Sequence, residues 1–424
     1  MATRLAPVRA LFGPRRFGRL ITAQALSQTA DGLYQIALAS VLVFNVSAAK
    51  TPAQVTKLLA VTLLPYSVVG PFTGPFIDRF SRRSILVGTS VGRVVLTALL
   101  VPAIGWPEPV LLTLVVANMA LNRFFHATRG AVLPTLVEPD QYLLGNAVST
   151  TVGMVFGLSG AVVGGPITDT ISPEVTIAVA AALIAGAAVA AATLPLPGGE
   201  RRGLAGLVAE LREDTRDVLE GLRRIRESPH ARYAIGAIWS IRGLLGFILL
   251  SSLVVLRERF DIRATGASIL FGAIAVGSFI GAVTVPAIAR LLGRERVIPA
   301  AFLVAGFALL LAGPIPAWAA LLASVSTGGF AMATTKITAD TMIQRTIPDG
   351  FRGRAFAVYD IGYNGVFVLA ALVPTVLRPF ISDVVLVIGA GVLAIAAGGL
   401  FAARGRRLPD QATRDDRTMR GDGQ

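Results

Sequence analysis

The chain has 424 residues, of which 54% are hydrophobic and 15% are charged, and its net charge is +14. Apolar stretches of about eighteen or more residues recur along it, which is typical of a polytopic helical membrane protein. These stretches are continuous and do not alternate with a period of two, so an outer-membrane barrel is excluded. The basic residues lie in short clusters between the apolar stretches, and the positive-inside rule explains this pattern better than nucleic-acid binding does.

The sequence offers little for catalysis or metal binding. It contains no cysteine and only two histidines, His126 and His230, so disulfides, thiolate chemistry and a histidine-based metal site are excluded. No catalytic triad, metal cluster or phosphate-binding loop is recognisable, and we therefore expect neither an enzyme nor a cofactor. The arginine-rich N-terminus precedes a long apolar segment without a cleavage site, so we expect this first span to be retained.

Apolar segments of about twenty residues predict about twelve transmembrane helices, and hence an all-α polytopic fold. The expected spans of the first half are residues 17–46, 55–78, 84–105, 109–134, a fifth that ends near 169, and 175–194. The spans of the second half begin near Tyr233 and end near Ala403, with turns near residues 257–263, 290–296, 314–316, 348–354 and 378–383.

Composition also predicts how the chain is divided. Within residues 200–229, leucine and valine recur at helical spacing among arginines and glutamates, which predicts an amphipathic surface helix. This helix either rests on the inner leaflet or binds a lipid or a partner. We expect a six-helix unit at 1–197, the linker at 198–230, a second six-helix unit at 231–404, and a disordered cytoplasmic tail at 405–424.

The basic turns predict the orientation. If the N-terminus is inside, the arginines of the 79–83 turn, the linker, the 290–296 and 345–354 turns and the tail share one side. The positive-inside rule then predicts a multi-pass protein of the plasma (inner) membrane with both termini in the cytoplasm. The basic cluster at 257–263, on the other side, is a local exception.

The two halves show a weak internal repeat. A shift of about 211 residues places Asp31-Gly-Leu on Arg242-Gly-Leu and residues 78–79 on 289–290, and a shift of about 209 places 138–140 on 347–349. Three matches at nearly constant offset predict two parallel, pseudo-symmetric bundles around a central site.

The turn Gly74-x3-Asp78-Arg79-x2-Arg82-Arg83 is densely charged. Glycine permits close helix approach, and the carboxylate can bond helix-end amides or an arginine of the other bundle in one state and lose them in the other. We therefore predict a conformational latch, which consists of Gly74, Asp78, Arg79 and Arg82. The alternative is that the arginines only enforce topology and contact lipid phosphates.

Several motifs resemble those of a known family. The 74–83 turn resembles the loop 2–3 signature of the major facilitator superfamily, and Gly160-x3-Gly164-Gly165-Pro166 resembles that family's helix-packing motif of antiporters. Residues 31–38 and 344–354 are similar to the branch of enterobactin exporters and macrolide-efflux proteins. The resemblance spans about residues 15–400. It implies the major facilitator fold, in which helices 1, 4, 7 and 10 line a central cavity.

Charged residues fall in the middle of these four helices. A charge at bilayer depth costs several kcal/mol unless it is paired or wetted, so charges without a role are not expected. The expected cavity consists of Asp31, Gln28, Gln35, Asn122, Arg123, His126, Arg242, Lys336, Asp340 and Asp360, and Arg93 is a further candidate.

Arg123-x2-His126 resembles the family's helix-four motif, whose arginine is implied to tune a nearby protonatable carboxylate. Asp31 is the natural candidate, so Asp31 and Arg123 are the expected proton-coupling pair. Burial favours a protonated carboxyl group and an adjacent guanidinium favours the ionised form, so movement of Arg123 would change the proton affinity. The alternative is a permanent Asp31–Arg123 ion pair. Arg242 is expected to pair with Asp340 or Asp360, or to meet an anionic group of a substrate.

These features together predict a secondary active transporter. We expect proton-coupled export (antiport) of a small amphiphilic molecule, such as a drug or siderophore, by alternating access. Its partners would be the substrate, protons and membrane lipids, with no nucleic acid, and we expect a monomer. One alternative keeps the fold and transports a lysophospholipid or another lipid. Another is a membrane receptor or scaffold that transports nothing and acts through the linker.

Overall fold

The computed structural model describes residues 11–12, 15–41, 76–77, 80–138, 141–196, 220–260, 264–312, 315, 317–347, 349–377 and 379–408. Most of the predicted second span, most of the predicted linker and the residues after 408 lie outside these ranges. Within them, the chain forms α-helices joined by short turns, and no strand occurs in this part of the chain.

The first bundle consists of α2 (Arg15–Ala39), α5 (Arg82–Ala103), α6 (Glu108–Val132) with the short 3-10 turn η3 (Leu133–Thr135), α7 (Tyr142–Thr170) and α8 (Pro173–Ala192). Serine side chains cap the starts of two helices: Ser81 accepts from Ser84 N, and Ser172 accepts from Val175 N. Such caps satisfy amides that the helix itself leaves unbonded. α2 packs against α7 and α8, and α5 packs against α6 and α8.

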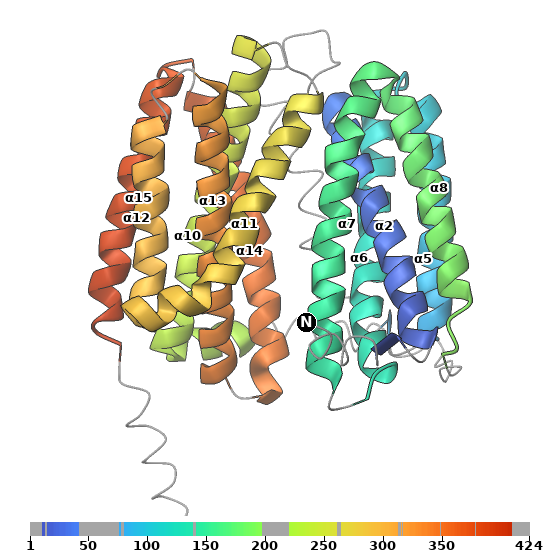
Figure 1. The fold of residues 1–424 in the computed structure, drawn as a ribbon, viewed down its shortest axis with the longest axis horizontal. Helices are drawn as coiled ribbons and strands as arrows, with labels where there is room; N and C mark the ends of the chain where they lie inside the picture. The colour runs from blue at the N-terminus through green and yellow to red at the C-terminus, as the bar shows by residue number, and fades with distance from the viewer. Residues whose placement is uncertain are drawn as a thin grey trace, which may run out of the picture.

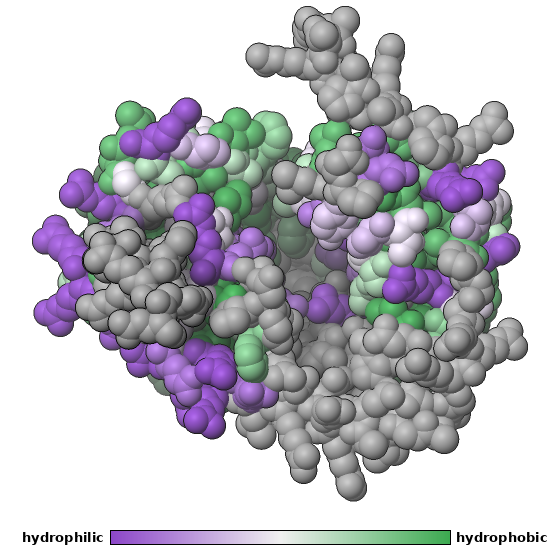
Figure 2. Space-filling model, turned by 90° about the horizontal axis from the view of Figure 1, so that it is seen from below, coloured by the Kyte–Doolittle hydropathy of each residue, from purple (hydrophilic) through white to green (hydrophobic). Residues whose placement is uncertain are grey.

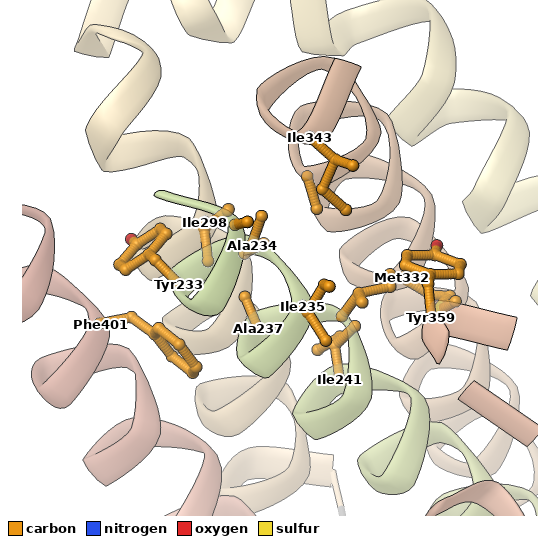
Figure 3. Close-up of a cluster of buried hydrophobic side chains, with 14 of the residues drawn as sticks. Tyr233, Ala234, Ile235, Ala237, Ile241, Ile298, Met332, Ile343, Tyr359 and Phe401 are labelled. Carbon is orange, nitrogen blue, oxygen red and sulfur yellow. The ribbon is translucent and has the colours of Figure 1, made fainter. Parts of the chain in front are cut away.

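The second bundle consists of α10 (Pro229–Phe260), α11 (Ala264–Leu292), α12 (Arg294–Ala312), α13 (Trp318–Thr346), α14 (Asp349–Leu377) and α15 (Asp383–Gly405). α13 packs against α10, α11 and α12, while α14 packs on α10 and α15 packs on α12. Figure 3 shows its core, in which Tyr233 and Phe401 meet edge to face and Met332 lies beside Tyr359.

The two bundles repeat the same packing. α2 packs on α7 as α10 packs on α14, and α5 packs on α6 and α8 as α12 packs on α13 and α15. Seven of the described helices are long and apolar enough to cross a membrane. These pairings confirm the predicted all-α fold with two pseudo-symmetric bundles. The predicted limits of the units, at residues 197, 230 and 404, stay predictions.

The bundles meet mainly along α7 and α11 (Figure 1). The end of α7 and the start of α11 lie side by side at the top of Figure 1, while α2 begins and α15 ends at the bottom. Seen from below, the surface is hollowed between the two bundles (Figure 2). The cleft is therefore open on the side where α2 begins, and the bundles are in contact on the opposite side.

Candidate functional site

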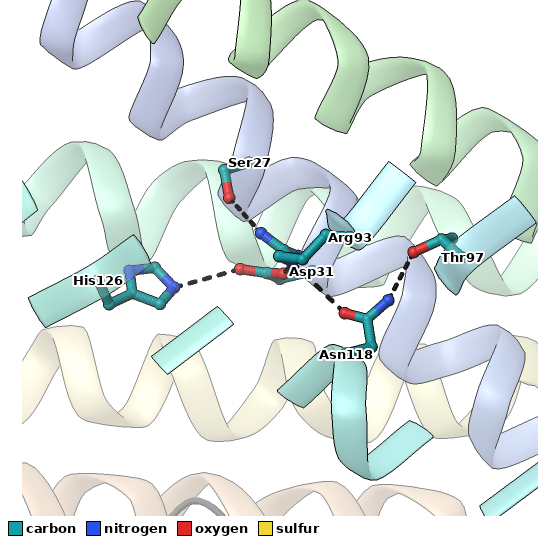
Figure 4. A network of polar contacts seen from close by, with 6 residues as sticks. All are labelled: Ser27, Asp31, Arg93, Thr97, Asn118 and His126. Carbon is teal, nitrogen blue, oxygen red and sulfur yellow. Dashed lines mark hydrogen bonds and ion pairs between the residues drawn. The ribbon is translucent and has the colours of Figure 1, made fainter. Parts of the chain in front are cut away.

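A buried polar network surrounds Asp31 in the first bundle (Figure 4). The Asp31 carboxylate forms an ion pair with Arg93 of α5, and its other oxygen lies 3.3 Å from His126 Nε2 of α6. The Arg93 side chain is only 1% exposed, and its Nη1 donates to Ser27 Oγ at 2.9 Å. Three helices thus hold one carboxylate between a guanidinium and an imidazole.

The network gives every guanidinium nitrogen of Arg93 an acceptor. Arg93 Nε donates to Asn118 Oδ1 at 3.4 Å, and Asn118 Nδ2 donates in turn to Thr97 Oγ1 at 2.6 Å. Each of the three guanidinium nitrogens therefore has an acceptor. A buried charge without such partners would cost several kcal/mol, so this arrangement holds Asp31 and Arg93 in place together.

The guanidinium beside Asp31 belongs to Arg93 and not to Arg123, and the role of Asp31 and Arg123 in proton coupling stays a prediction. His126 occupies the α6 position that faces Asp31. Arg123 lies three residues earlier, so it is turned by about 60° around the helix axis and points elsewhere. Its Nη2 donates to Asp360 Oδ2 of α14 at 3.0 Å.

The Arg123–Asp360 ion pair joins the two bundles. Its side chains are 25% and 42% exposed, which agrees with a position in the open cleft. A pair with this much solvent contact contributes roughly 0.2–1 kcal/mol. It can therefore form and break as the bundles move, at little cost.

The charges of the second bundle are arranged differently from the expectation. Lys336 Nζ lies 2.6 Å from Asp340 Oδ2, one turn along α13, and 3.2 Å from the Tyr359 hydroxyl. Arg242 pairs with neither Asp340 nor Asp360. Its guanidinium lies over the rings of Tyr363, at 4.4 Å, and Phe367, at 4.2 Å.

The neutral polar residues of the expected cavity take different positions. Gln28 Oε1 and Asn122 Oδ1 are buried and accept no hydrogen bond from any residue that the structure describes. Gln35 lies exposed on α2. No contact brings these three amides together, and their role as cavity residues stays a prediction.

The glycine-proline motif of α7 packs against both bundles. A Cβ at Gly160 would collide with the Thr29 carbonyl of α2, and one at Gly164 would lie 3.2 Å from Leu33 Cα. A Cβ at Gly165 would collide with the Ser268 side chain and lie 2.8 Å from the Ala264 carbonyl of α11. Pro166 lies within α7 directly after them. These glycines allow α7 to approach α2 on one face and α11 on another.

One carboxylate that the sequence reasoning missed connects the bundles at this closed end. Asp169, near the end of α7, accepts from Ala264 N at 3.1 Å and from Thr265 N at 2.7 Å, so it caps the start of α11. At the same end of α11, Ile36 of α2 is buried against Ala264 and Ala267. The available signal was an aspartate three residues after Pro166, but only the fold reveals the amides that it binds.

Of the predicted latch, Gly74, Asp78 and Arg79 lie outside the described residues. Arg82 Nη1 donates to the Ala131 carbonyl at 3.0 Å, near the end of α6 in its own bundle. A cation at a helix C-terminus is favourable, so this contact supports α6 and does not bridge the two bundles.

Known proteins share both the sequence pattern and the fold. The family model of the Major Facilitator Superfamily matches residues 20–371. An uncharacterized MFS-type transporter of Mycobacterium bovis is 31% identical, over 86% of this chain and 85% of its own, and one of Mycobacterium tuberculosis matches equally.

Two solved structures resemble the fold. A POT family transporter in complex with 5-aminolevulinic acid superimposes with a TM-score of 0.75 at 12% identity, over 94% of this chain and 98% of that one. The nucleoside transporter NupG (D323A mutant) superimposes with a TM-score of 0.62 at 14% identity, over 93% of this chain and 100% of that one. The match of the family model and the relatives of the same type establish that this chain belongs to the major facilitator superfamily, as a multi-pass membrane transporter.

Proposed function

We propose that the protein exports a small amphiphilic molecule across the plasma membrane in exchange for protons. The observation that carries this proposal is the Asp31 carboxylate, which is 12% exposed and held between Arg93 and His126 within the first bundle. Family membership favours transport over a receptor or scaffold role.

The network couples a proton to the shape of the first bundle. A proton on Asp31 would leave the buried Arg93 guanidinium without its counterion, which is strongly unfavourable. To give the Arg93 guanidinium a new partner or access to water, α2, α5 or α6, the helices that hold the network, would have to shift. Because α2 packs on α7, and α7 forms the contact with α11, such a shift reaches the interface between the bundles. Protonation would thus favour one conformation over the other.

The position of the cleft supports alternating access. The positive-inside rule places the start of α2 and the end of α15 in the cytoplasm, and the cleft opens on that side. In this conformation a substrate enters from the cytoplasm. The opposite state requires the α7–α11 contact to separate and the cytoplasmic side to close, where the predicted latch around Asp78 would hold it.

The direction of transport and the type of substrate rest on motifs. Residues 31–38 and 344–354 are similar to enterobactin exporters and macrolide-efflux proteins, and the α7 motif is similar to that of antiporters. These similarities support export, and they support a substrate that has both polar and apolar parts.

The test uses purified protein in proteoliposomes, with a substrate identified by a susceptibility panel in cells with and without the chain. We expect the Asp31→Asn variant to lose accumulation driven by a pH gradient while it retains exchange of labelled for unlabelled substrate. Glu227→Gln, which removes a carboxylate that is 46% exposed, is the control and should accumulate normally. An Asp31→Asn protein that concentrates substrate at the wild-type rate would remove Asp31 from coupling and refute the proposal.

A further inference from the structure

The mid-span charges of the two bundles do not balance. Among the described residues, three of the four mid-span cations have a carboxylate partner: Arg93 with Asp31, Arg123 with Asp360, and Lys336 with Asp340. The fourth is Arg242, for which the described part of the chain supplies no carboxylate. One positive charge therefore remains without a negative partner from these residues.

Two aromatic rings fix the orientation of Arg242. Its guanidinium carbon lies 4.4 Å from the centre of the Tyr363 ring and 4.2 Å from that of Phe367. Its Nε is enclosed and donates no hydrogen bond to the described residues. A ring face attracts a cation, but it does not accept N–H groups as a carboxylate does. The guanidinium is thus held in place while its hydrogen-bonding capacity is left unused.

Arg242 lies on the inner side of α10. Ser240 and Leu244, two positions before and after it, line an apolar pocket between α10, α14 and α15. A step of two residues turns a helix by about 200°, so Arg242 points away from that pocket. It is half-buried, so part of its side chain remains accessible.

The aromatic residues connect Arg242 to the wall of the cleft. Tyr363 stacks on Tyr359 with ring centres 5.7 Å apart, and the Tyr359 hydroxyl contacts Lys336. Asp360, which meets Arg123 of the other bundle, lies three and seven residues before Tyr363 and Phe367, so these side chains share one face of α14. Arg242, which lies over the two rings, is therefore next to the face of α14 that reaches the first bundle.

We propose that Arg242 binds the anionic group of the transported molecule, and that this molecule is an organic monoanion, best a carboxylate. The inference rests on the transport function proposed above and names its substrate class. A guanidinium presents paired N–H groups that match the two oxygens of a carboxylate, and here the rings hold it before the ligand arrives. A single negative charge completes the pairing of the four cations, whereas a second would lie unpaired in the cleft.

This substrate class has an electrical consequence. Export of a monoanion in exchange for one proton moves a negative charge outward and a positive charge inward, so both follow an inside-negative potential. Export of a neutral molecule by the same exchange would move only the proton's charge.

Binding can be measured with Trp239, whose indole N–H donates to the Tyr359 carbonyl at 3.1 Å, close to the proposed site. A Trp106→Phe/Trp318→Phe background leaves Trp239 as the remaining tryptophan of the chain. The probes are 4-phenylbutyrate and decanoate, each compared with its uncharged amide, with thermal unfolding as a second readout. We expect at least one carboxylate to bind tenfold or more tightly than its amide.

The variants separate the charge from the packing. Arg242→Gln should abolish the preference for carboxylate over amide, while Arg242→Lys should retain part of it. Phe367→Leu keeps the guanidinium but removes one ring, and it should weaken carboxylate binding severalfold. This variant tests the site even if Arg242→Gln fails to fold. Arg296→Gln removes an exposed cation and should change nothing. Equal binding of every carboxylate and its amide, or an undiminished preference in Arg242→Gln, would overturn the inference.

The two proposals fail in different ways. If proton-driven transport depends on Asp31 but the substrate is neutral or cationic and insensitive to Arg242→Gln, proton coupling stands and the monoanion site is refuted. If carboxylates bind through Arg242 but a pH gradient drives no transport, the site stands and proton coupling is refuted. In proteoliposomes, an imposed inside-negative potential without a pH gradient should by itself drive efflux of the bound carboxylate. An efflux rate that does not depend on the potential would contradict the proposal that the substrate is a monoanion.

Discussion

Removal of the Asp169 carboxylate should open the closed end of the transporter. Asp169 accepts two backbone N–H groups at the start of α11, and these belong to the other bundle. The contact exists only while α7 and α11 are together. Its loss therefore destabilises the conformation in which α7 and α11 are in contact and leaves the opposite conformation unaffected.

The size of the effect follows from the geometry. An N-cap side chain contributes about 0.5–2 kcal/mol, and a negative charge at a helix N-terminus contributes about 0.3–1 kcal/mol of interaction with the helix dipole. Asp169 is exposed, so solvent screening places it in the lower part of these ranges. We expect Asp169→Ala to shift the equilibrium by about 1 kcal/mol, or about fivefold in population. Asp169→Asn keeps one acceptor and should have a smaller effect.

The absence of cysteine from the chain makes a direct assay possible. Ile36 is 1% exposed and lies against Ala264 and Ala267 of α11, so it becomes accessible when α7 and α11 separate. In an Ile36→Cys background, the rate of maleimide labelling reports the fraction of molecules that are open at this end. Asp169→Ala should raise this rate about fivefold, in proportion to the population.

A matched cap elsewhere provides the control. Ser172 accepts from Val175 N at the start of α8, within the first bundle. Ser172→Ala should lower thermal stability by an amount similar to that of Asp169→Ala, but it should leave the labelling rate unchanged. Equal labelling rates in Asp169→Ala and the parent would refute the role of this carboxylate as a link between the bundles.

Two further predictions concern stability. Arg93→Gln leaves the Asp31 carboxylate buried without its guanidinium, so it should lower the free energy of unfolding by about 3–5 kcal/mol and the unfolding temperature with it. The Asp31→Asn/Arg93→Gln double variant should largely restore the unfolding temperature. A double variant no more stable than Arg93→Gln would contradict this pairing. Gly160→Ala should destabilise the protein because the added Cβ collides with the α2 backbone. The control is Gly88→Ala, whose Cβ meets nothing within 4 Å, and it should be neutral or stabilising by up to about 1 kcal/mol. Equal effects of the two variants on the unfolding temperature would exclude close packing at Gly160.

Much of the fold could be predicted because the bilayer imposes it locally. A span must be long and apolar, and basic residues gather in the turns of one side, so length and composition locate the helices without any knowledge of their neighbours. The expected span at 84–105 corresponds to α5 (Arg82–Ala103), and that at 175–194 corresponds to α8 (Pro173–Ala192). The repeat between Asp31 and Arg242 likewise places these two residues on the equivalent helices α2 and α10.

The sequence alone determined that charges lie within the membrane, but not which of them meet. Asp31 pairs with Arg93, 62 residues away, and Arg123 pairs with Asp360, 237 residues away. Periodicity relates a residue to its own helix, whereas these pairs depend on how far each helix is rotated toward its neighbours. The same holds for Asp169, which is an unremarkable helix-end carboxylate until the start of α11 packs against it. The tertiary structure decided these contacts because they join helices, and in one case two bundles, that the chain connects only through distant turns.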